Sequence, residues 1–334
     1  MSRHLFGGDK MGVAVLGTGS ALPEKILTNF DLEKMVDTTD EWITRRTGMK
    51  ERHIGEKESV AYLATKACER ALEKAGKNAE DVDLIIVATC TTEMLLPCAG
   101  CRVQSMLGAK DAIAFDINAA CGGFLFALST AYHYIKAGTC KNALVVGSEV
   151  LSEIIDWTDR GTCVLFGDGA GAVYVENCDD DKRGIVSTYQ GSNGNLGEIL
   201  YCRGRKVKAE TEPEINSEDL LVKMKGSEVY KFAVRQVPVC IEKALDRADW
   251  KVDDVDLFLL HQANTRILES VAKTLKADYE RFPVNMDKVG NTSSASIPIL
   301  LDELNRDGRI AKGQKLVLSG FGAGMTFGAL TMVW

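Results

Sequence analysis

A cysteine set between small residues is the first group in this chain that could do chemistry. Cys121 follows an apolar strand pattern that ends at Ile117, and a helical pattern runs on from Phe124. The thiol is therefore predicted at a helix N-terminus, where unpaired N–H groups and the helix dipole favour the thiolate and lower the thiol pKa. The neighbouring alanines and glycines would let a substrate carbonyl approach the backbone amides. The pattern predicts a nucleophile, although a lone cysteine is more often a small buried hydrophobe.

A histidine occupies a comparable position in the second half of the chain. His261 directly follows the apolar run Leu257–Leu260, and a helical pattern begins at Thr265 and extends to Lys276. The point where a strand end opens into a helix is where catalytic groups gather in α/β proteins. The other three histidines have less suggestive positions, so His261 is the candidate for proton or hydrogen-bond chemistry.

Two further turns combine small and polar residues. Asn291 lies in the run Gly290–Pro298, where by itself it would be interpreted as a helix N-cap. Gly320–Gly324 follows a predicted strand and lacks the full dinucleotide-binding pattern, but it could supply an oxyanion-hole amide. Cys98 and Cys101 have the spacing of a zinc or redox pair. They lack a second pair and a nearby histidine, so that signal is weak.

A repeat at about half the chain length links the elements that must position these groups. Ala71–Ala75 matches Ala244–Ala248, and Glu80–Leu84 matches Asp253–Leu257, both 173 positions later. Strands alternate with helices in each half, which predicts buried, partly parallel sheets with helices on their faces. We therefore predict an internally duplicated α/β protein. Its halves are residues 11–178, which carry the cysteine, and residues 183–334, which carry the histidine and asparagine.

The predicted elements pair up between the halves. A helix over Ala61–Ala75 corresponds to one over Val229–Ala248, where Pro238 favours a late start or a kink. The segment Leu151–Gly169 is interpreted as an insert, and Glu198–Lys225 as a loop with short elements. The predicted strands are Gly12–Leu16, Val82–Thr89, Ala143–Gly147 and Gly171–Glu176 in the first half, and Gly184–Thr188, Val255–His261, Lys315–Gly320 and Gly328–Trp334 in the second.

Composition excludes several classes of protein. Hydrophobic residues make up 46% and charged residues 26% of the chain, which is typical of a globular protein and not of a disordered chain, collagen or coiled coil. No apolar run approaches the roughly 18 residues of a membrane helix, and the N-terminus lacks the apolar region of a secretory signal. The net charge of −7 disfavours a nucleic-acid partner. Ten scattered cysteines indicate a reducing, cytoplasmic location.

Taken in order, the motifs at Cys121, His261, Asn291 and Gly320–Gly324 resemble those of the thiolase-fold condensing enzymes. The similarity is greatest to the β-ketoacyl-[acyl-carrier-protein] synthase III family and covers about residues 11–334. The resemblance implies a five-layered αβαβα fold, a homodimer, and no metal or redox cofactor. The other segments that carry the resemblance are Asp40–Ile43, Arg46–Gly48, Asp159–Thr162 and Phe166–Gly171.

The resemblance also implies roles in a two-stage condensation that starts fatty-acid chains. Cys121 resembles the nucleophile that takes an acyl group from acyl-CoA, and the expected primer is acetyl-CoA or another short acyl-CoA. His261 and Asn291 resemble the pair that serves decarboxylation of malonyl-acyl carrier protein. The backbone amides of Cys121, Gly322 and Ala323 resemble an oxyanion hole.

Further residues resemble binding positions of that family. Trp42 and Arg160 are similar to a pair that sandwiches the CoA adenine, Arg46 to a CoA contact, and Asn264 to a pantetheine-channel residue. Arg266 resembles a carrier-protein contact. Lys273 is seven positions further along the same predicted helix, so the two bases would share a face toward an acidic carrier. Leu96 stands where the family often has a bulky aromatic that closes the neighbouring subunit's acyl pocket, so the length and branching of the primer stay open.

Several alternatives remain at this stage. A polyketide-type starter ketosynthase shares all of these motifs. A thiolase would carry a second cysteine in the last glycine-rich loop, and Phe321–Gly328 has none; a hydroxymethylglutaryl-CoA-type synthase is a related possibility. Chain-elongating synthases carry a second histidine where this chain has Asn291. The Cys-His-Asn set alone would also describe a thioester hydrolase or protease, and a non-catalytic paralogue that binds carrier protein is disfavoured by the intact set.

Overall fold

The sheet of the first half forms one layer of the molecule. In the computed structural model, which describes residues 12–180, 182–204 and 220–334, its strand order is β1-β7-β6-β4-β5. Strand β4 pairs in parallel with β5 and β6, whereas β7 pairs antiparallel with β6 and β1. The strands are β1 (Gly12–Ala21), β4 (Leu84–Ala88), β5 (Ile113–Ile117), β6 (Asn142–Glu149) and β7 (Gly169–Cys178). The apolar run of β4 is buried throughout, as expected for a strand covered on both faces.

The sheet of the second half repeats this arrangement. Its order is β11-β12-β13-β8, with β11 and β12 parallel and the remaining pairs antiparallel. The strands are β8 (Gly184–Ser192), β11 (Leu257–Leu260), β12 (Lys315–Gly322) and β13 (Thr326–Val333). Read from β8, the order β8-β13-β12-β11 matches β1-β7-β6-β4 strand for strand, which is the arrangement that a duplicated motif produces. The exact limits of the halves, 11–178 and 183–334, stay a prediction.

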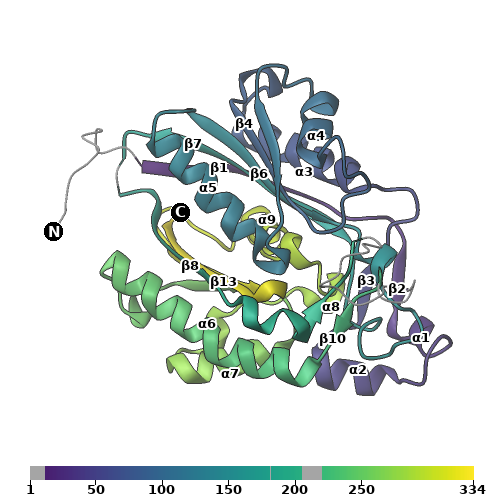
Figure 1. Ribbon diagram of the computed structural model, residues 1–334. Coiled ribbons are helices and arrows are strands. Elements are labelled where there is room, and N and C mark those ends of the chain that lie inside the picture. The colour runs from purple at the N-terminus through teal and green to yellow at the C-terminus, as the bar shows by residue number, and fades with distance from the viewer. Residues whose placement is uncertain (1–11, 181, 205–219) are drawn as a thin grey trace.

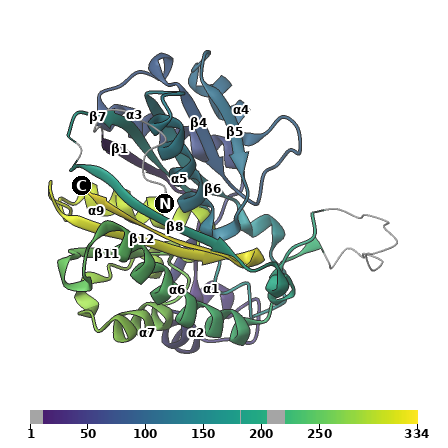
Figure 2. The same ribbon diagram turned by 60° about the vertical axis from the view of Figure 1, so that its left-hand side comes forward.

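Helices cover and separate the two sheets, and Figures 1 and 2 show the resulting layers. Helix α3 (Val60–Ala75) packs on β1, β6 and β7, and α4 (Ala99–Leu107) packs beside it on β4 and β5. Helices α5 (Gly123–Lys136) and α9 (Ser296–Arg306) lie between the sheets, in contact with strands of both. Helix α6 (Gly226–Ala248) covers the outer face of the second sheet, and α7 (Thr265–Leu275) packs against α6. The five-layered αβαβα fold is confirmed.

Each interface between layers holds an apolar core. Ala64 and Val87 lie between α3 and the first sheet, Leu128 and Leu300 lie between the sheets, and Phe258 lies under α6 and α7. Burial of such side chains, at about 25 cal/mol per Å² of apolar surface, is the main stabilising term of a fold like this one. The central layer matters most for the site, because α5 and α9 begin next to Cys121 and Asn291.

Short elements surround one end of this stack. They are β2 (Ile26–Thr28), α1 (Asn29–Leu32), α2 (Asp40–Thr47), β3 (Glu51–His53), β9 (Leu200–Tyr201), β10 (Lys223–Met224) and α8 (Met286–Val289). Strands β9 and β10 are short elements within residues 198–225, the segment expected to be a loop with short elements, of which residues 205–219 lie outside the described residues. Helix α6 begins at Gly226 and runs through the buried Pro238, so of the two alternatives expected for it the late start is wrong, and the kink stays a prediction.

Two general properties follow from the described residues. Within them, no helix is both long enough and apolar enough to cross a membrane. The ten cysteines all fall in this part of the chain, and all are free thiols.

Candidate active site

Cys121 lies in the turn that connects the first sheet to a helix of the central layer. Strand β5 ends at Ile117, the 3-10 turn η2 (Ala120–Gly122) follows, and α5 begins at Gly123. Ala120 adopts a φ of 47°, a left-handed conformation that reverses the chain sharply before the helix. A Cβ atom at Gly123 would lie 3.2 Å from the Ala88 methyl group, so only a small residue fits there. The predicted strand-to-helix turn with a thiol at the helix start is present.

The predicted lowering of the Cys121 thiol pKa is wrong for the free protein. Burial raises the pKa to about 12, and the Glu149 carboxylate adds to this rise. The Ser293 side chain and the backbone N–H of Cys121 itself lower this pKa, but their effect is smaller than that of burial. Desolvation disfavours the charged form of any acid, and here it outweighs the groups that favour the thiolate. The resting nucleophile is therefore a neutral thiol.

The last glycine-rich turn lies directly against the cysteine. A Cβ atom at Gly322 would come within 2.5 Å of the Cys121 backbone nitrogen and 3.0 Å of that of Gly122. The end of β12 and the start of α5 can be this close only because Gly322 has no side chain. Ala323 follows in the 3-10 turn η9 (Ala323–Met325). The backbone amides of the two turns are thus neighbours, although their role as an oxyanion hole stays a prediction.

His261 extends from the end of β11 and is almost completely buried. Its backbone N–H donates to the Ser319 carbonyl at 2.8 Å, which continues the pairing of β11 with β12. Its Nδ1 lies 2.7 Å from the Ser296 hydroxyl at the start of α9. Burial lowers the pKa of the imidazole to about 3, so the ring is neutral at physiological pH. The ring edge packs against Phe321, with the ring centres 5.6 Å apart.

Asn291 is held by its backbone and by its side-chain carbonyl. The backbone N–H donates to the Leu165 carbonyl at 2.9 Å, and the backbone carbonyl accepts from Gly167 at 3.0 Å. The side-chain Oδ1 accepts from the Ser293 backbone N–H at 2.9 Å. Because the oxygen end is engaged in this way, the NH₂ group is the donor end. Asn291 is therefore not a helix N-cap, since α9 begins at Ser296, with Ala295 before it.

One cavity of about 600 Å³ brings the predicted site residues together. Cys121, His261 and Asn291 all line it, and so do Phe321 and Gly322. Apolar side chains such as Leu165, Phe166, Val229 and Ile267 form much of its wall. The predicted CoA, pantetheine and carrier residues that line it are Trp42, Arg46, Arg160, Asn264 and Arg266. A largely apolar cleft with a few convergent polar groups is the usual form of a small-molecule site.

The entrance of this cavity carries an aromatic ring with two cations. The guanidinium carbons of Arg46 and Arg160 lie 4.8 and 5.2 Å from the centre of the Trp42 ring. Arg160 also donates to the Asp37 backbone carbonyl at 2.7 Å. Cations over an indole face are attracted by the ring's electron density. A nucleotide base could take the same face by displacing one guanidinium.

Asn264 and Arg266 have structural contacts as well as exposure to the cavity. Asn264 is the N-cap of α7, and its Oδ1 accepts from the Ile267 backbone N–H at 3.0 Å. The Arg266 guanidinium lies 5.4 Å from the centre of the Tyr230 ring on α6. Lys273 is exposed on the same helix but does not line the cavity in the described structure. The cap explains why α7 begins where it does and leaves the asparagine amide at the cavity wall.

Leu96 is not brought to this site. It is 83% exposed in the loop between β4 and α4, and it does not line the cavity in the part of the chain that the structure describes. Within the same part, no three His, Cys, Asp or Glu side chains gather so as to hold a metal ion. That the chain needs no cofactor stays a prediction.

Sequence reasoning missed three polar residues next to the site. Ser296 contacts the imidazole of His261, and Ser293 favours the charged form of the Cys121 thiol and so opposes the rise of its pKa. Glu149 is completely buried at the end of β6 and accepts from Ser293 and Ser294. The serines lie within the small polar run around Asn291. A signal for Glu149 was available too, because a carboxylate directly after an apolar strand is unusual in a buried position.

The comparisons with known proteins agree with this geometry. Residues 115–194 match the family model "3-Oxoacyl-[acyl-carrier-protein (ACP)] synthase III", and residues 245–334 match the model of its C-terminal part. The β-ketoacyl-[acyl-carrier-protein] synthase III of Clostridium acetobutylicum is 46% identical over 322 residues, which cover 96% of this chain and 98% of that protein. The corresponding protein of Caldanaerobacter subterraneus is 47% identical over 328 residues, which cover 98% and 99%.

Solved structures extend the comparison to the fold. The 3-oxoacyl-[acyl-carrier-protein] synthase III of Aquifex aeolicus superposes with a TM-score of 0.91 at 44% identity and covers 97% of this chain and 100% of that chain. A priming β-ketosynthase of a polyketide biosynthetic pathway also superposes with a TM-score of 0.91, at 33% identity, and covers 99% and 98%. The chain therefore belongs to the β-ketoacyl-[acyl-carrier-protein] synthase III family of acyltransferases.

Proposed function

We propose that this chain joins a short acyl group from acyl-CoA to a malonyl unit on acyl carrier protein and so starts fatty-acid chains. The observation that carries the proposal is the shared cavity of Cys121, His261 and Asn291, whose entrance carries Trp42 and Arg160. The set supplies one nucleophile and two neutral hydrogen-bond donors. Neutral donors beside the nucleophile suit the enolate of a decarboxylative condensation, whereas a hydrolysis needs a base that activates water, for which an imidazole with a pKa of about 3 is poorly suited.

The first stage transfers the acyl group to Cys121. The sulfur attacks the thioester carbonyl, and CoA leaves as the acyl-cysteine forms. Splitting one difficult reaction into two easier ones is the purpose of such a covalent intermediate. The backbone N–H groups of Cys121 and of the neighbouring Gly322–Ala323 turn would donate hydrogen bonds to the negative oxygen of the tetrahedral intermediate.

The second stage forms the carbon–carbon bond. Loss of CO₂ from the malonyl group leaves an enolate, whose oxygen needs donors that carry no negative charge. Ser296 accepts from the Gln262 backbone N–H at 3.5 Å and can donate to Nδ1 of His261, which leaves the imidazole proton on Nε2. Nε2–H and the NH₂ group of Asn291 then stabilise the enolate. Its carbon attacks the acyl-cysteine, and the collapse of the second tetrahedral intermediate releases the product.

The entrance residues suit the two substrate carriers. Trp42 offers a face to the CoA adenine once Arg160 or Arg46 yields its place, and Asn264 borders the path toward Cys121. Arg266 at the rim and Lys273 on the same helix present positive charge to an acidic carrier protein. Opposite charge of this kind steers association.

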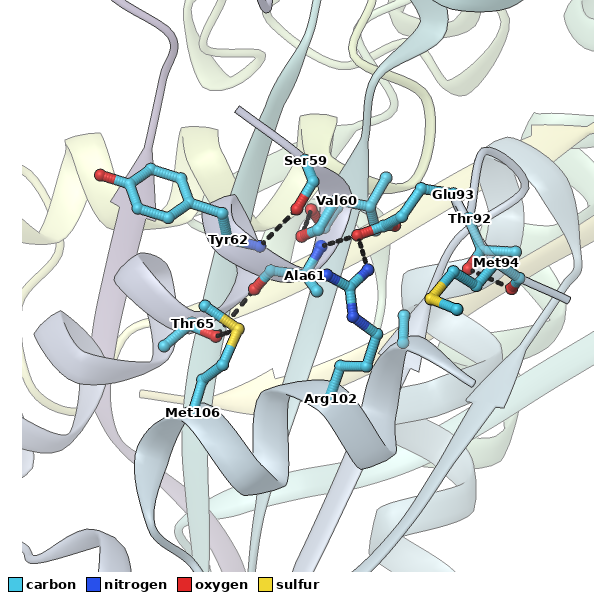
Figure 3. Close-up of polar contacts among 12 residues, drawn as sticks. Ser59, Val60, Ala61, Tyr62, Thr65, Thr92, Glu93, Met94, Arg102 and Met106 are labelled. Carbon is cyan, nitrogen blue, oxygen red and sulfur yellow. Dashed lines mark hydrogen bonds and ion pairs between the residues drawn. The ribbon is translucent and has the colours of Figure 1, made fainter. Parts of the chain in front are cut away.

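We also propose that two copies pair through the β5 edge of the first sheet. In the described residues β5 pairs with β4 on one side, and an unpaired strand edge invites another strand. The exposed loop residues Leu95 and Leu96 follow Glu93, which accepts from the Ala61 backbone N–H and pairs with Arg102 (Figure 3). An anchored loop with an apolar tip is suited to enter a second copy. There Leu96 would border the acyl pocket of the partner.

A polyketide starter synthase is the second candidate, favoured by the 33% identical priming β-ketosynthase. The two differ in the acyl-CoA that primes the reaction. Turnover measured over a series of primer lengths separates them, since a fatty-acid initiator prefers the shortest chains.

Free thiols throughout the chain suit a reducing compartment, and we therefore propose a cytoplasmic location.

Intact-mass spectrometry with acyl-CoA tests the first stage. The wild-type chain should gain one acyl group, and Cys121→Ala should gain none. Cys101→Ala, which removes an exposed thiol, is the matched control and should behave like the wild type. An acyl adduct that survives Cys121→Ala would overturn the assignment of the nucleophile.

A further inference from the structure

Glu149 is a buried carboxyl group that the two-stage reaction does not use directly. It is the last residue of β6, where its backbone still pairs with Gly169 of β7, and its side chain is fully enclosed. A buried carboxylate costs folding free energy unless donors surround it. Its partners therefore indicate which parts of the fold it holds together, and they come from two loops that lie far apart in the sequence.

One oxygen of Glu149 anchors the side chain to the loop that follows β4. Oε2 accepts from the Thr91 hydroxyl at 2.6 Å, the Cys90 backbone N–H at 3.1 Å and the Thr89 hydroxyl at 3.2 Å. The two threonine hydroxyls themselves accept from backbone N–H groups, those of Val150 and Thr91. Their own hydrogens are therefore available for Oε2. With three donors on one oxygen, the carboxylate is a fixed point beside the site.

The other oxygen of Glu149 holds the turn that follows Asn291. Oε1 accepts from the hydroxyls of Ser294 at 2.8 Å and Ser293 at 3.1 Å. Ser293 has a φ of 50°, a left-handed conformation that costs conformational energy in any residue with a side chain. Such a backbone persists only where its surroundings hold it. The hydroxyl contact with Glu149 supplies part of that hold.

Ser293 in turn determines which end of the Asn291 amide is available to the cavity. The Ser293 backbone N–H donates to Oδ1 of Asn291 at 2.9 Å. An amide turned by half a revolution would bring its NH₂ group against this N–H, and two donors cannot bond each other. The NH₂ group therefore remains the end that serves the cavity shared with Cys121 and His261. Whatever fixes Ser293 also fixes this donor.

We propose that Glu149 is a positioning residue for the second stage, which holds Ser293 in its left-handed conformation and through it orients the Asn291 amide toward the enolate. The inference rests on the proposed function. Glu149 does not line the cavity in the described part of the chain, so it acts through two successive hydrogen bonds. Each donor of the second stage then has its own support, since Ser296 contacts His261 in a comparable way.

Release of CO₂ from malonyl carrier protein, measured on protein already acylated at Cys121, tests this role. Acylation is completed first and checked by intact mass, so that an effect of Ser293 on the thiol does not enter the rate. Ser293→Ala removes the hydroxyl that contacts Glu149 but keeps the backbone N–H. The maximal rate of CO₂ release should fall about tenfold, because a misplaced donor loses much of its effect. The carrier concentration that gives half of this rate should not change.

A matched control accompanies this variant. Ser105→Ala removes an exposed hydroxyl on α4 and should keep the wild-type rate of CO₂ release.

Two exchanges of Glu149 distinguish the hydrogen-bonded link from the mere presence of a charge. Glutamine keeps a carbonyl oxygen for the Cys90 N–H, and its NH₂ group can donate to the Ser293 hydroxyl, so the link survives. Glu149→Gln should therefore retain CO₂ release within about threefold of the wild-type rate, whereas Glu149→Ala should lose about 100-fold. Glu153→Ala, an exposed exchange four residues on, is the control and should leave the rate unchanged.

A double-mutant cycle shows whether Ser293 acts through Asn291. In an Asn291→Ala background no amide is left to orient, so Ser293→Ala should change the remaining rate of CO₂ release by less than about twofold. Additive losses would overturn the proposal, since they would show that the two residues affect the rate independently.

The remaining outcomes separate the inference from the proposed function. Ser293→Ala with a wild-type rate of CO₂ release would overturn the positioning role alone. A Glu149→Gln variant as slow as Glu149→Ala would also overturn it, because the charge and not the link would then matter. If Glu149→Ala fails to fold, Ser293→Ala and the cycle with Asn291 still decide. A wild-type chain that is acylated but releases no CO₂ would overturn the proposed function together with the inference.

Discussion

Exchanging Asn291 for aspartate separates the two stages of the proposed reaction. The change keeps the shape of the side chain and replaces its NH₂ group with an oxygen. One carboxylate oxygen can still accept from the Ser293 backbone N–H, as Oδ1 of Asn291 does at 2.9 Å. The other oxygen then meets the enolate as an acceptor instead of a donor. Nothing in this exchange touches the attack of Cys121 on acyl-CoA.

The size of the effect follows from the buried position of Asn291, which is 6% exposed. Loss of one preorganised donor costs about 3 kcal/mol in the transition state. An ionised carboxylate about 3 Å from the enolate adds repulsion of about 5 kcal/mol at an effective dielectric constant of about 20. The decarboxylation step should therefore slow by at least about 10³-fold. Acylation of Cys121 should stay within about threefold of the wild type, since the variant preserves the cavity shape.

Two measurements on the same sample check this prediction. Intact mass follows the acyl adduct, and CO₂ release from malonyl carrier protein follows the second stage. Asn78→Asp, an exposed exchange at the surface, is the matched control and should leave both rates unchanged. CO₂ release within tenfold of the wild-type rate would refute the donor role of Asn291. Loss of the acyl adduct in a folded variant would refute the separation of the stages.

Four further predictions follow from the same geometry. Ser296→Ala removes the partner of Nδ1 in His261, so the rate of CO₂ release should fall about tenfold or more. Urea unfolding should show that the free energy of unfolding is lower by about 1–3 kcal/mol. If neither the rate nor the free energy of unfolding changed, the result would contradict the contact. The pKa of His261 is about 3 in the folded chain and about 6.5 in the unfolded chain, so below pH 6.5 the unfolded chain binds the extra proton. The free energy of unfolding should therefore fall by at most about 5 kcal/mol toward pH 3. His261→Gln should remove this pH-dependent component, and a variant with an unaltered pH profile of stability would count against it. Trp42→Ala should raise KM for acyl-CoA about tenfold but leave KM unchanged for a pantetheine thioester that lacks the nucleotide. An equal rise of KM with both substrates would exclude stacking of Trp42 on adenine. Arg266→Glu should raise KM for malonyl carrier protein and spare acyl-CoA transfer, so an unchanged KM would argue against the carrier contact.

Much of the site could be predicted because its members lie at the ends of regular elements. Cys121 and His261 each follow a strand and precede a helix, and such turns leave local patterns in hydrophobicity and small residues. The repeated strand order could be anticipated for a related reason, since a duplicated motif repeats its apolar spacing. Helix α6 departs from expectation, because the buried Pro238 is tolerated within it.

The electrostatics of the site could not be predicted in the same way. A helix N-terminus favours a thiolate, but the degree of burial that outweighs it depends on which elements cover the turn. Glu149 meets hydroxyls from residues about 60 and about 145 positions away, and no local pattern reports such a meeting. Arg46 and Arg160 over the Trp42 ring are a further contact between distant segments, which the sequence alone could not place.

The mass of the carrier protein after one round of reaction tests the central claim most directly. The protein is incubated with acetyl-CoA and malonyl carrier protein, with Cys121→Ala run in parallel. The account predicts a carrier that has lost CO₂ and gained the acyl group, together with free CoA, and no such product from Cys121→Ala. A malonyl carrier of unchanged mass beside free acetate and CoA would contradict the account and identify a thioester hydrolase.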